Sequence, residues 1–106
     1  MESKAVGMIG LGIMGSAMSA SLIRAGFKVV GFDVVPRRRQ DHRKADGIVV
    51  RSCREVAKRC DILVTSLPSS EALLDTAVEL AKGARARQIV IETSTLPIPE
   101  IGRAHV

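Results

Sequence analysis

The sequence predicts an α/β protein with a Rossmann-type, doubly wound parallel sheet of about five strands. Three observations support this prediction. Apolar runs alternate with segments of helical periodicity along the whole chain, which is the pattern of repeated strand and helix units. A glycine-rich turn follows the first run, and the acidic Asp33 ends the second. The 106 residues, 46% of them hydrophobic, suit one domain, so residues 1–106 are expected to form a single folded unit.

The first half of the chain contains two strand and helix units. Residues 5–9 are apolar throughout, as expected of a strand that is buried on both faces. A helix is expected over residues 13–25, ended by Gly26 in the left-handed conformation. Its inward stripe should consist of Met14, Met18, Leu22 and Ala25. Residues 27–33 form the second strand, and Pro36 begins a short, charged helix that Gly47 closes.

The second half repeats this pattern. Residues 48–50 suit a short strand, and Ser52 with Glu55 matches a capping box, in which each side chain accepts a hydrogen bond from an amide at the helix start. That helix ends near Cys60, and residues 61–66 form a fourth strand. A helix over residues 71–82, ended by Gly83, should bury Leu73, Leu74, Ala77, Val78 and Ala81. Residues 88–92 form the fifth strand, and residues 93–100 open a further helix.

The turn after the first strand has the pattern G-x-G-x-x-G, formed by Gly10, Gly12 and Gly15. The pattern is indicative of a binding turn here because it lies between an expected strand and an expected helix. Gly10 permits the tight turn, Gly12 lets the backbone approach a pyrophosphate, and Gly15 lets the helix pack closely on the strand. The amides and the positive dipole end of that helix then bind the anion, so the turn predicts a dinucleotide site.

Asp33 supplies the acid that such sites place at the end of the second strand, 18 residues after Gly15, to bind the adenosine ribose. A carboxylate beside a 2′-phosphate is repelled by about 4 kcal/mol at about 4 Å and an effective dielectric constant of about 20, so NAD is favoured over NADP. The run of Arg37, Arg38 and Arg39 keeps NADP possible, because one guanidinium in a folded-back position would bind a phosphate.

Composition excludes several other classes of function. The net charge of +5 suits an anionic partner, but Phe27 and Phe32 are the only aromatic residues and no recognition motif accompanies the basic run, so no nucleic-acid partner is expected. Cys53 and Cys60 lie on one helix face, and we expect reduced, partly buried thiols and no metal site. Without a signal peptide or an apolar run of membrane length, the sequence predicts a cytoplasmic protein with no membrane partner.

Residues 10–19, GLGIMGSAMS, resemble the N-terminal signature of the β-hydroxyacid dehydrogenases, a family that includes 3-hydroxyisobutyrate dehydrogenase and, more distantly, 6-phosphogluconate dehydrogenase. Three further matches follow in order. Residues 32–36, FDVVP, are similar to the end of the family's second strand, residues 65–69, TSLPS, to its "LP" turn, and residues 92–95, ETST, to its D-x-S-T substrate motif. The likeness extends from Val6 to about Glu100.

The resemblance implies a role for each matching residue in a 3-hydroxy acid dehydrogenase that uses NAD or NADP. Asp33 would bind the adenosine ribose, Leu67 and Pro68 the middle of the cofactor, and Thr95 its nicotinamide side. Ser94 would orient the substrate carboxylate, although Ser94 and Thr95 also suit helix capping. The pyrophosphate would be held by Gly10, Leu11, Gly12, Ile13, Met14 and Gly15.

The chain also departs from the family pattern. Glu92 replaces the usual Asp, and Pro97 and Pro99 fit an insertion of one residue, which leaves the substrate open. The family's second, helical domain carries a catalytic lysine in a motif that nothing here matches, so we expect a truncated cofactor domain with no catalytic residue and little activity of its own. The alternatives are a non-catalytic dinucleotide-binding or interaction module, or a decayed remnant of the enzyme. A homo-oligomer is possible in each case.

Overall fold

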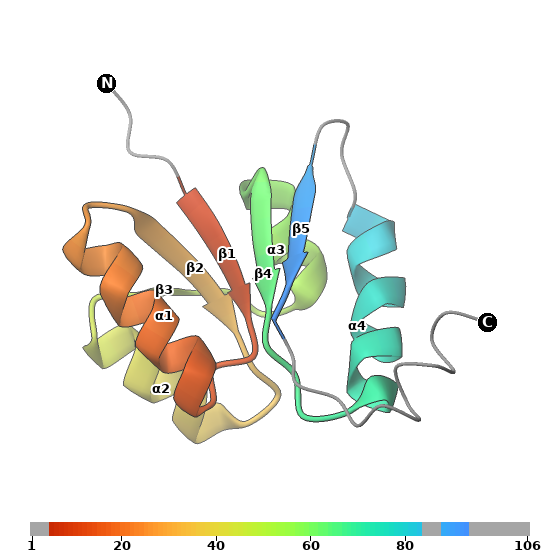
Figure 1. Cartoon of the computed structure of the whole chain (residues 1–106), viewed down its shortest axis with the longest axis horizontal. Helices are drawn as coiled ribbons and strands as arrows, with labels where there is room; N and C mark the ends of the chain where they lie inside the picture. Colours follow the sequence, from red (N-terminus) through yellow and green to blue (C-terminus); the bar gives the residue numbers. More distant parts are fainter. Residues whose placement is uncertain (1–4, 84–87, 94–106) are drawn as a thin grey trace.

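The computed structural model describes residues 5–83 and 88–93, which form one five-stranded sheet between two layers of helices (Figure 1). All strand pairs are parallel, and the strand order is β3-β2-β1-β4-β5. The strands are β1 (Ala5–Ile9), β2 (Lys28–Phe32), β3 (Ile48–Val49), β4 (Ile62–Thr65) and β5 (Ile89–Glu92). The order reverses between β2 and β4, on either side of β1, so the predicted doubly wound fold is confirmed.

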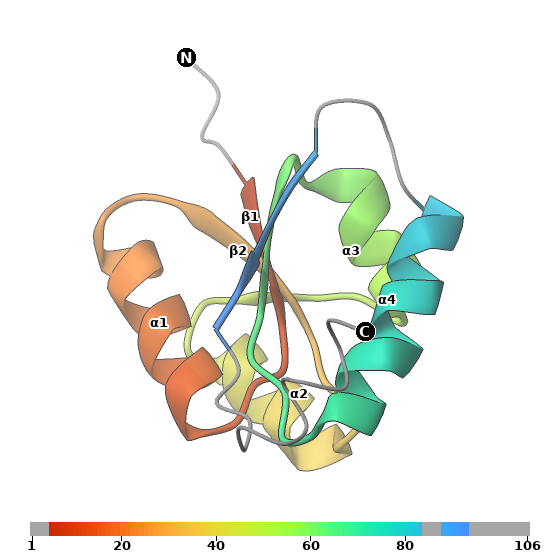
Figure 2. The same ribbon diagram turned by 45° about the vertical axis from the view of Figure 1, so that its right-hand side comes forward.

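Four helices cover the two faces of the sheet. They are α1 (Ile13–Arg24), α2 (Pro36–Lys44), α3 (Cys53–Arg59) and α4 (Ser70–Gly83). Figures 1 and 2 show α1 and α2 on one side of the sheet and α3 and α4 on the other. This arrangement follows from right-handed crossovers, because the chain moves outward from β1 in opposite directions in its two halves. None of the helices in the described ranges has the length and apolar character needed to cross a membrane.

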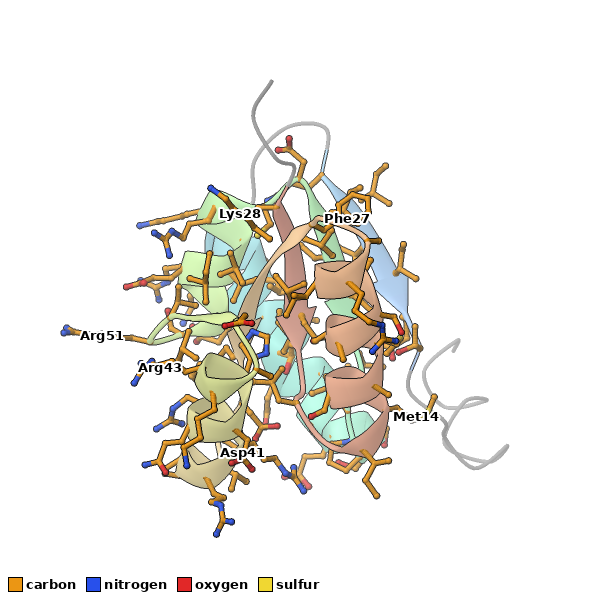
Figure 3. All side chains as sticks on the ribbon, turned by 90° about the vertical axis from the view of Figure 1, so that its left-hand side faces the viewer. Met14, Phe27, Lys28, Asp41, Arg43 and Arg51 are labelled. Carbon is orange, nitrogen blue, oxygen red and sulfur yellow. The ribbon has the colours of Figure 1, made fainter. Side chains whose placement is uncertain are left out.

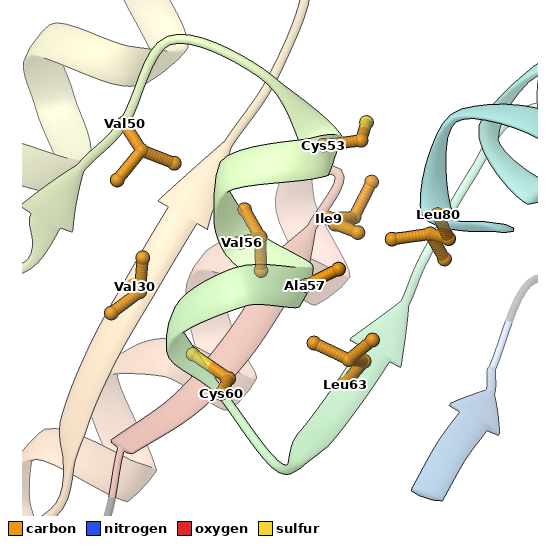
Figure 4. Packing of buried hydrophobic residues seen from close by; sticks show 9 residues of the cluster. All are labelled: Ile9, Val30, Val50, Cys53, Val56, Ala57, Cys60, Leu63 and Leu80. Carbon is orange, nitrogen blue, oxygen red and sulfur yellow. The ribbon is translucent and has the colours of Figure 1, made fainter. Parts of the chain in front are cut away.

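The core lies on both faces of β1. On one face, Val56 and Ala57 of α3 and the following Cys60 pack with Leu63 of β4 and other buried residues (Figure 4). On the other, Met8 and Val29 pack under α1. Burial on both faces explains the continuous apolar run in β1.

Two local features were predicted correctly. Ser52 caps α3, since its hydroxyl accepts a hydrogen bond of 3.2 Å from the Glu55 N–H. Gly26 follows α1 with φ of +96°, the left-handed conformation that favours glycine.

The predicted inward stripe of α1 was partly wrong. Met18 and Leu22 pack against the core, but Met14 is 53% exposed and Ala25 is also exposed. The residues most deeply buried in this helix are Gly15 and Ser19. A short side chain at each of these positions lets the helix lie close to the sheet, and close packing moves the buried stripe away from the large side chains.

The predicted inward face of α4 was wrong to a greater extent. Leu74 and Val78 are 63% and 59% exposed, and Ala77 and Ala81 are exposed as well, while Leu73 is half-buried. Thr76, Leu80 and Gly83 make the buried contacts instead. Gly83 packs against Arg54 and Ala57 of α3. Contact with α3 therefore decides which side of α4 faces inward, and the apolar periodicity of α4 by itself does not.

Candidate dinucleotide-binding site

The glycine-rich turn joins β1 to α1 at the carboxyl end of the sheet. Gly10 has φ of +97°, and a Cβ atom there would collide with the Ser66 carbonyl after β4. A Cβ atom on Gly15 would collide with the Gly10 carbonyl. Gly12 differs, because the nearest atoms to its Cβ position belong to the Arg38 guanidinium, at 3.9 Å. Gly10 and Gly15 are thus required by packing, whereas Gly12 keeps open the space in front of the helix.

The start of α1 is free to bind an anion. Gly12 is the N-cap residue, and no side chain caps this helix. Ile13 is 93% exposed, and Met14 points away from the sheet in the first turn (Figure 3). The unoccupied amides and the helix dipole make such a terminus favourable for a phosphate group.

Asp33 lies at the end of β2 and is 6% exposed. Its Oδ2 accepts a hydrogen bond of 2.7 Å from the Leu11 N–H, and its Oδ1 accepts one of 2.8 Å from the Val35 N–H. The carboxylate therefore ties the glycine-rich turn to the chain after β2. Two carboxylate oxygens offer about four acceptor positions, so Asp33 keeps capacity for ribose hydroxyls.

The three consecutive arginines have different surroundings. Arg37 pairs with Asp41 at 3.7 Å on the exposed side of α2. Arg39 donates a hydrogen bond of 2.7 Å to the Asp33 carbonyl and lies over the Phe32 ring. Only Arg38 of the three lines the cleft described below, with its Nη1 3.6 Å from Asp33 Oδ2.

Other cations of this region face solvent. Arg43 in α2 and Arg51 after β3 are exposed and project outward from the ribbon (Figure 3). They contribute to the positive charge of the surface and take no part in the cleft.

A cleft of 610 Å³ runs along the carboxyl end of the sheet, within the usual size range of ligand sites. One wall carries the glycine-rich turn, Asp33, Val34 and Arg38, and the opposite wall begins with the turn after β4. The predicted residues that line it are Gly10, Gly12, Ile13, Met14, Asp33, Leu67 and Pro68. Leu11 and Gly15 are buried behind the turn and do not line it.

Sequence reasoning missed the part of the cleft that α3 and α4 form. Its lining residues there are Cys53, Ala72, Asp75 and Thr76. Thr76 is buried and hydrogen-bonds with Cys53. The available signal for this wall was the polar pair Asp75 and Thr76 within the otherwise mostly apolar run of residues 72–78.

Both cysteines are free thiols and are more deeply buried than the partial burial predicted. Burial raises the pKa of the Cys53 thiol, and the negative charge of Glu79 adds to this effect. Within residues 5–83 and 88–93, no group of three or more histidine, cysteine or acidic side chains is placed to hold a metal ion.

The substrate motif is only partly visible, because Ser94 and Thr95 lie outside the described residues. The preceding residues join the ends of β4 and β5. Thr65 Oγ1 donates a hydrogen bond of 2.5 Å to Glu92 Oε2, and Thr93 Oγ1 donates one of 2.8 Å to the Thr65 carbonyl. The glutamate that replaces the family's aspartate thus has a defined partner on the neighbouring strand.

Comparison with known proteins agrees with this geometry. The model of the NAD-binding domain of 6-phosphogluconate dehydrogenase matches residues 5–105. L-threonate dehydrogenase of Cupriavidus necator is 37% identical over 98 residues, which cover 90% of this chain and 33% of that protein. A probable 3-hydroxyisobutyrate dehydrogenase of Mycobacterium tuberculosis is 31% identical over 100 residues, which cover 94% of this chain and 34% of that protein.

Solved structures give the same picture. The M. tuberculosis 3-hydroxyisobutyrate dehydrogenase with L-serine superposes with a TM-score of 0.86 at 30% identity, over 98% of this chain and 36% of that one. An imine reductase variant from Myxococcus stipitatus, in complex with NAD⁺, shares the fold with a TM-score of 0.82 at 18% identity, over 99% of this chain and 36% of that one. The 106 residues span about a third of the length of these relatives.

Proposed function

Because the chain belongs to the family of the 6-phosphogluconate dehydrogenase NAD-binding domain, we propose that its cleft holds a nicotinamide dinucleotide along the carboxyl end of the sheet. The observation that carries this proposal is the uncapped start of α1 beside the buried Asp33. One feature suits a pyrophosphate and the other suits the ribose attached to it.

The placement of the cofactor follows from the order of these groups along the cleft. The pyrophosphate lies against the turn and the first residues of α1, which are Gly10, Leu11, Gly12, Ile13, Met14 and Gly15. Gly10, Leu11 and Gly15 act through their backbone or by shaping the turn. Asp33 accepts hydrogen bonds from the adenosine ribose, and Leu67 and Pro68 contact the middle of the cofactor. Thr95 contacts the nicotinamide side of the cofactor, and Ser94 binds the substrate carboxylate.

Asp33 and Arg38 together set the preference between NAD and NADP. The carboxylate repels a 2′-phosphate, by about 4 kcal/mol at about 4 Å and an effective dielectric constant of about 20. Arg38, 3.6 Å from that carboxylate, opposes the repulsion with a positive charge on the same wall. We propose that NAD is preferred and that NADP is also accepted.

Titration with NADH and NADPH, followed by nicotinamide fluorescence, tests both statements. Saturable binding with a lower Kd for NADH is expected. In R38A the preference for NADH should widen, because a 2′-phosphate loses its cation. R37A is the matched control and should leave the preference unchanged, since Arg37 pairs with Asp41 away from the cleft. Absence of saturable binding of either dinucleotide would remove the proposed function.

For the longer protein we propose hydride transfer between the nicotinamide C4 and the C3 alcohol or aldehyde of a small 3-hydroxy acid. Relatives named for L-threonate and 3-hydroxyisobutyrate support this class of substrate, and the chain spans about a third of their length. Catalysis then needs residues outside these 106, and this segment should bind cofactor with little turnover alone.

The encoding DNA distinguishes the enzyme from a binding module without catalysis. An in-frame continuation with a lysine-bearing helical domain supports the enzyme. A natural stop at codon 107 supports the module or a decayed remnant of the enzyme.

A further inference from the structure

The lining of the cleft includes residues beyond those proposed above for the pyrophosphate and the ribose. There, Val34 and Arg38 form one wall, and Cys53, Asp75 and Thr76 form the other. Figure 2 shows why these segments meet, since α2 and α4 both begin at the carboxyl end of the sheet. With the pyrophosphate on the turn and the ribose on Asp33, as proposed above, the base attached to that ribose would enter the space between these two walls.

The polar side chains of the cleft differ in whether they already have partners. Asp33 holds two backbone amides, Arg38 lies beside Asp33, and Thr76 hydrogen-bonds with Cys53. Within the part of the chain that the structure describes, Asp75 has neither an ion pair nor a hydrogen bond. It is the one charged group lining the cleft whose hydrogen-bonding capacity is entirely available among those residues.

The chemistry of Asp75 matches one edge of adenine. An ionised carboxylate only accepts hydrogen bonds. The exocyclic amine at C6 is the hydrogen-bond donor of the adenine base, while the ring nitrogens N1, N3 and N7 accept. Arg38 on the opposite wall offers a flat cation that can stack on the face of the base. The two walls therefore present a stacking group and an acceptor to a planar base with one donor edge.

Building on the proposed dinucleotide site, we propose that Asp75 determines the choice of base, by accepting a hydrogen bond from the adenine 6-amino group. It is a specificity-determining residue for the cofactor and takes no part in the hydride step. The base that Asp75 disfavours is hypoxanthine, in which an accepting carbonyl replaces the donating amine at C6.

The test compares NADH with reduced nicotinamide hypoxanthine dinucleotide, both titrated by nicotinamide fluorescence. The wild type should bind NADH roughly tenfold more tightly, because the carboxylate loses a hydrogen bond and meets a carbonyl oxygen. In D75N the ratio should fall toward one, since an amide either accepts from an amine or donates to a carbonyl. E71Q is the matched control, an exposed acid of α4 outside the cleft, and should keep the wild-type ratio.

The outcomes separate this inference from the proposed function. Suppose that NADH binds saturably and that the ratio of its affinity to that of the hypoxanthine dinucleotide is the same in the wild type and in D75N. This result overturns the role of Asp75 and leaves the dinucleotide site intact. Equal affinity of the wild type for both dinucleotides has the same consequence. If neither dinucleotide binds, the site itself is wrong and the inference falls with it. Asp75 is exposed on α4, so circular dichroism should show D75N folded as the wild type.

Discussion

Replacement of Asp33 by asparagine should lower both the stability of the domain and its discrimination against NADPH. The buried carboxylate accepts hydrogen bonds from the Leu11 and Val35 amides at 2.7 and 2.8 Å. Asparagine keeps one accepting oxygen and presents an NH₂ group to the other amide. One charge-assisted hydrogen bond is lost, and a buried N–H remains unsatisfied, which together cost about 2–4 kcal/mol. That loss is a large share of a typical unfolding free energy of about 5–15 kcal/mol.

Urea unfolding followed by far-ultraviolet circular dichroism measures this cost, since the chain has no Trp or Tyr as a fluorescent probe. D41N is the matched control, because Asp41 forms an exposed i,i+4 pair with Arg37 and its loss should cost less than about 0.5 kcal/mol. A D33N variant within about 1 kcal/mol of the wild type would refute the structural role of the carboxylate. Where D33N still folds, its ratio of NADPH to NADH affinity should rise, since the repulsive charge is gone.

Three further predictions concern other parts of the molecule. G12A should abolish NADH binding in titrations yet leave urea unfolding nearly unchanged, whereas G10A should destabilise the domain, because its Cβ collides with the Ser66 carbonyl. Burial lowers the pKa of His42, so the unfolded state takes up a proton first and the unfolding free energy should fall as pH drops below about 6.5. H42Q, which keeps an N–H for the Val29 carbonyl, should flatten that dependence in urea titrations at several pH values. I89T should change the unfolding free energy by less than about 0.5 kcal/mol and reduce aggregation measured by light scattering, since Ile89 is 58% exposed on β5.

The sequence predicted the elements well because strands and helices follow from local patterns. The run in β1, the Ser52 cap and the left-handed Gly26 each depend on residues close together in the chain. The buried side of α4 depends on α3, which packs against Thr76, Leu80 and Gly83 rather than against Leu74 and Val78. Periodicity identifies an apolar face but does not say what covers it.

The candidate site follows the same rule: its local part was predictable from the sequence, and the part that depends on packing between helices was not. The part of the cleft formed by the glycine-rich turn comes from one contiguous segment with a known spacing of glycines, so the motif was sufficient to locate it. Its far wall joins Cys53 to Asp75 and Thr76, which meet only when α3 and α4 pack on the same face. Which of three adjacent arginines enters the cleft was also undetermined, because each position on α2 offers a different partner to a long side chain.

The pairing of β1 with β2 explains how the glycine-rich turn and Asp33 become neighbours although they are far apart in the sequence. β1 and β2 pair in parallel with Ile9 opposite Phe32, so the residues that follow each strand are neighbours. The Gly10 N–H donates to the Phe32 carbonyl at 2.9 Å, and the Leu11 N–H donates to Asp33 in the next step. A shift of one residue in this register would place the Asp33 side chain on the other face of the sheet. Strand pairing therefore places Asp33 beside the glycine-rich turn, and the carboxylate that we propose for the ribose is one that already holds this turn in place.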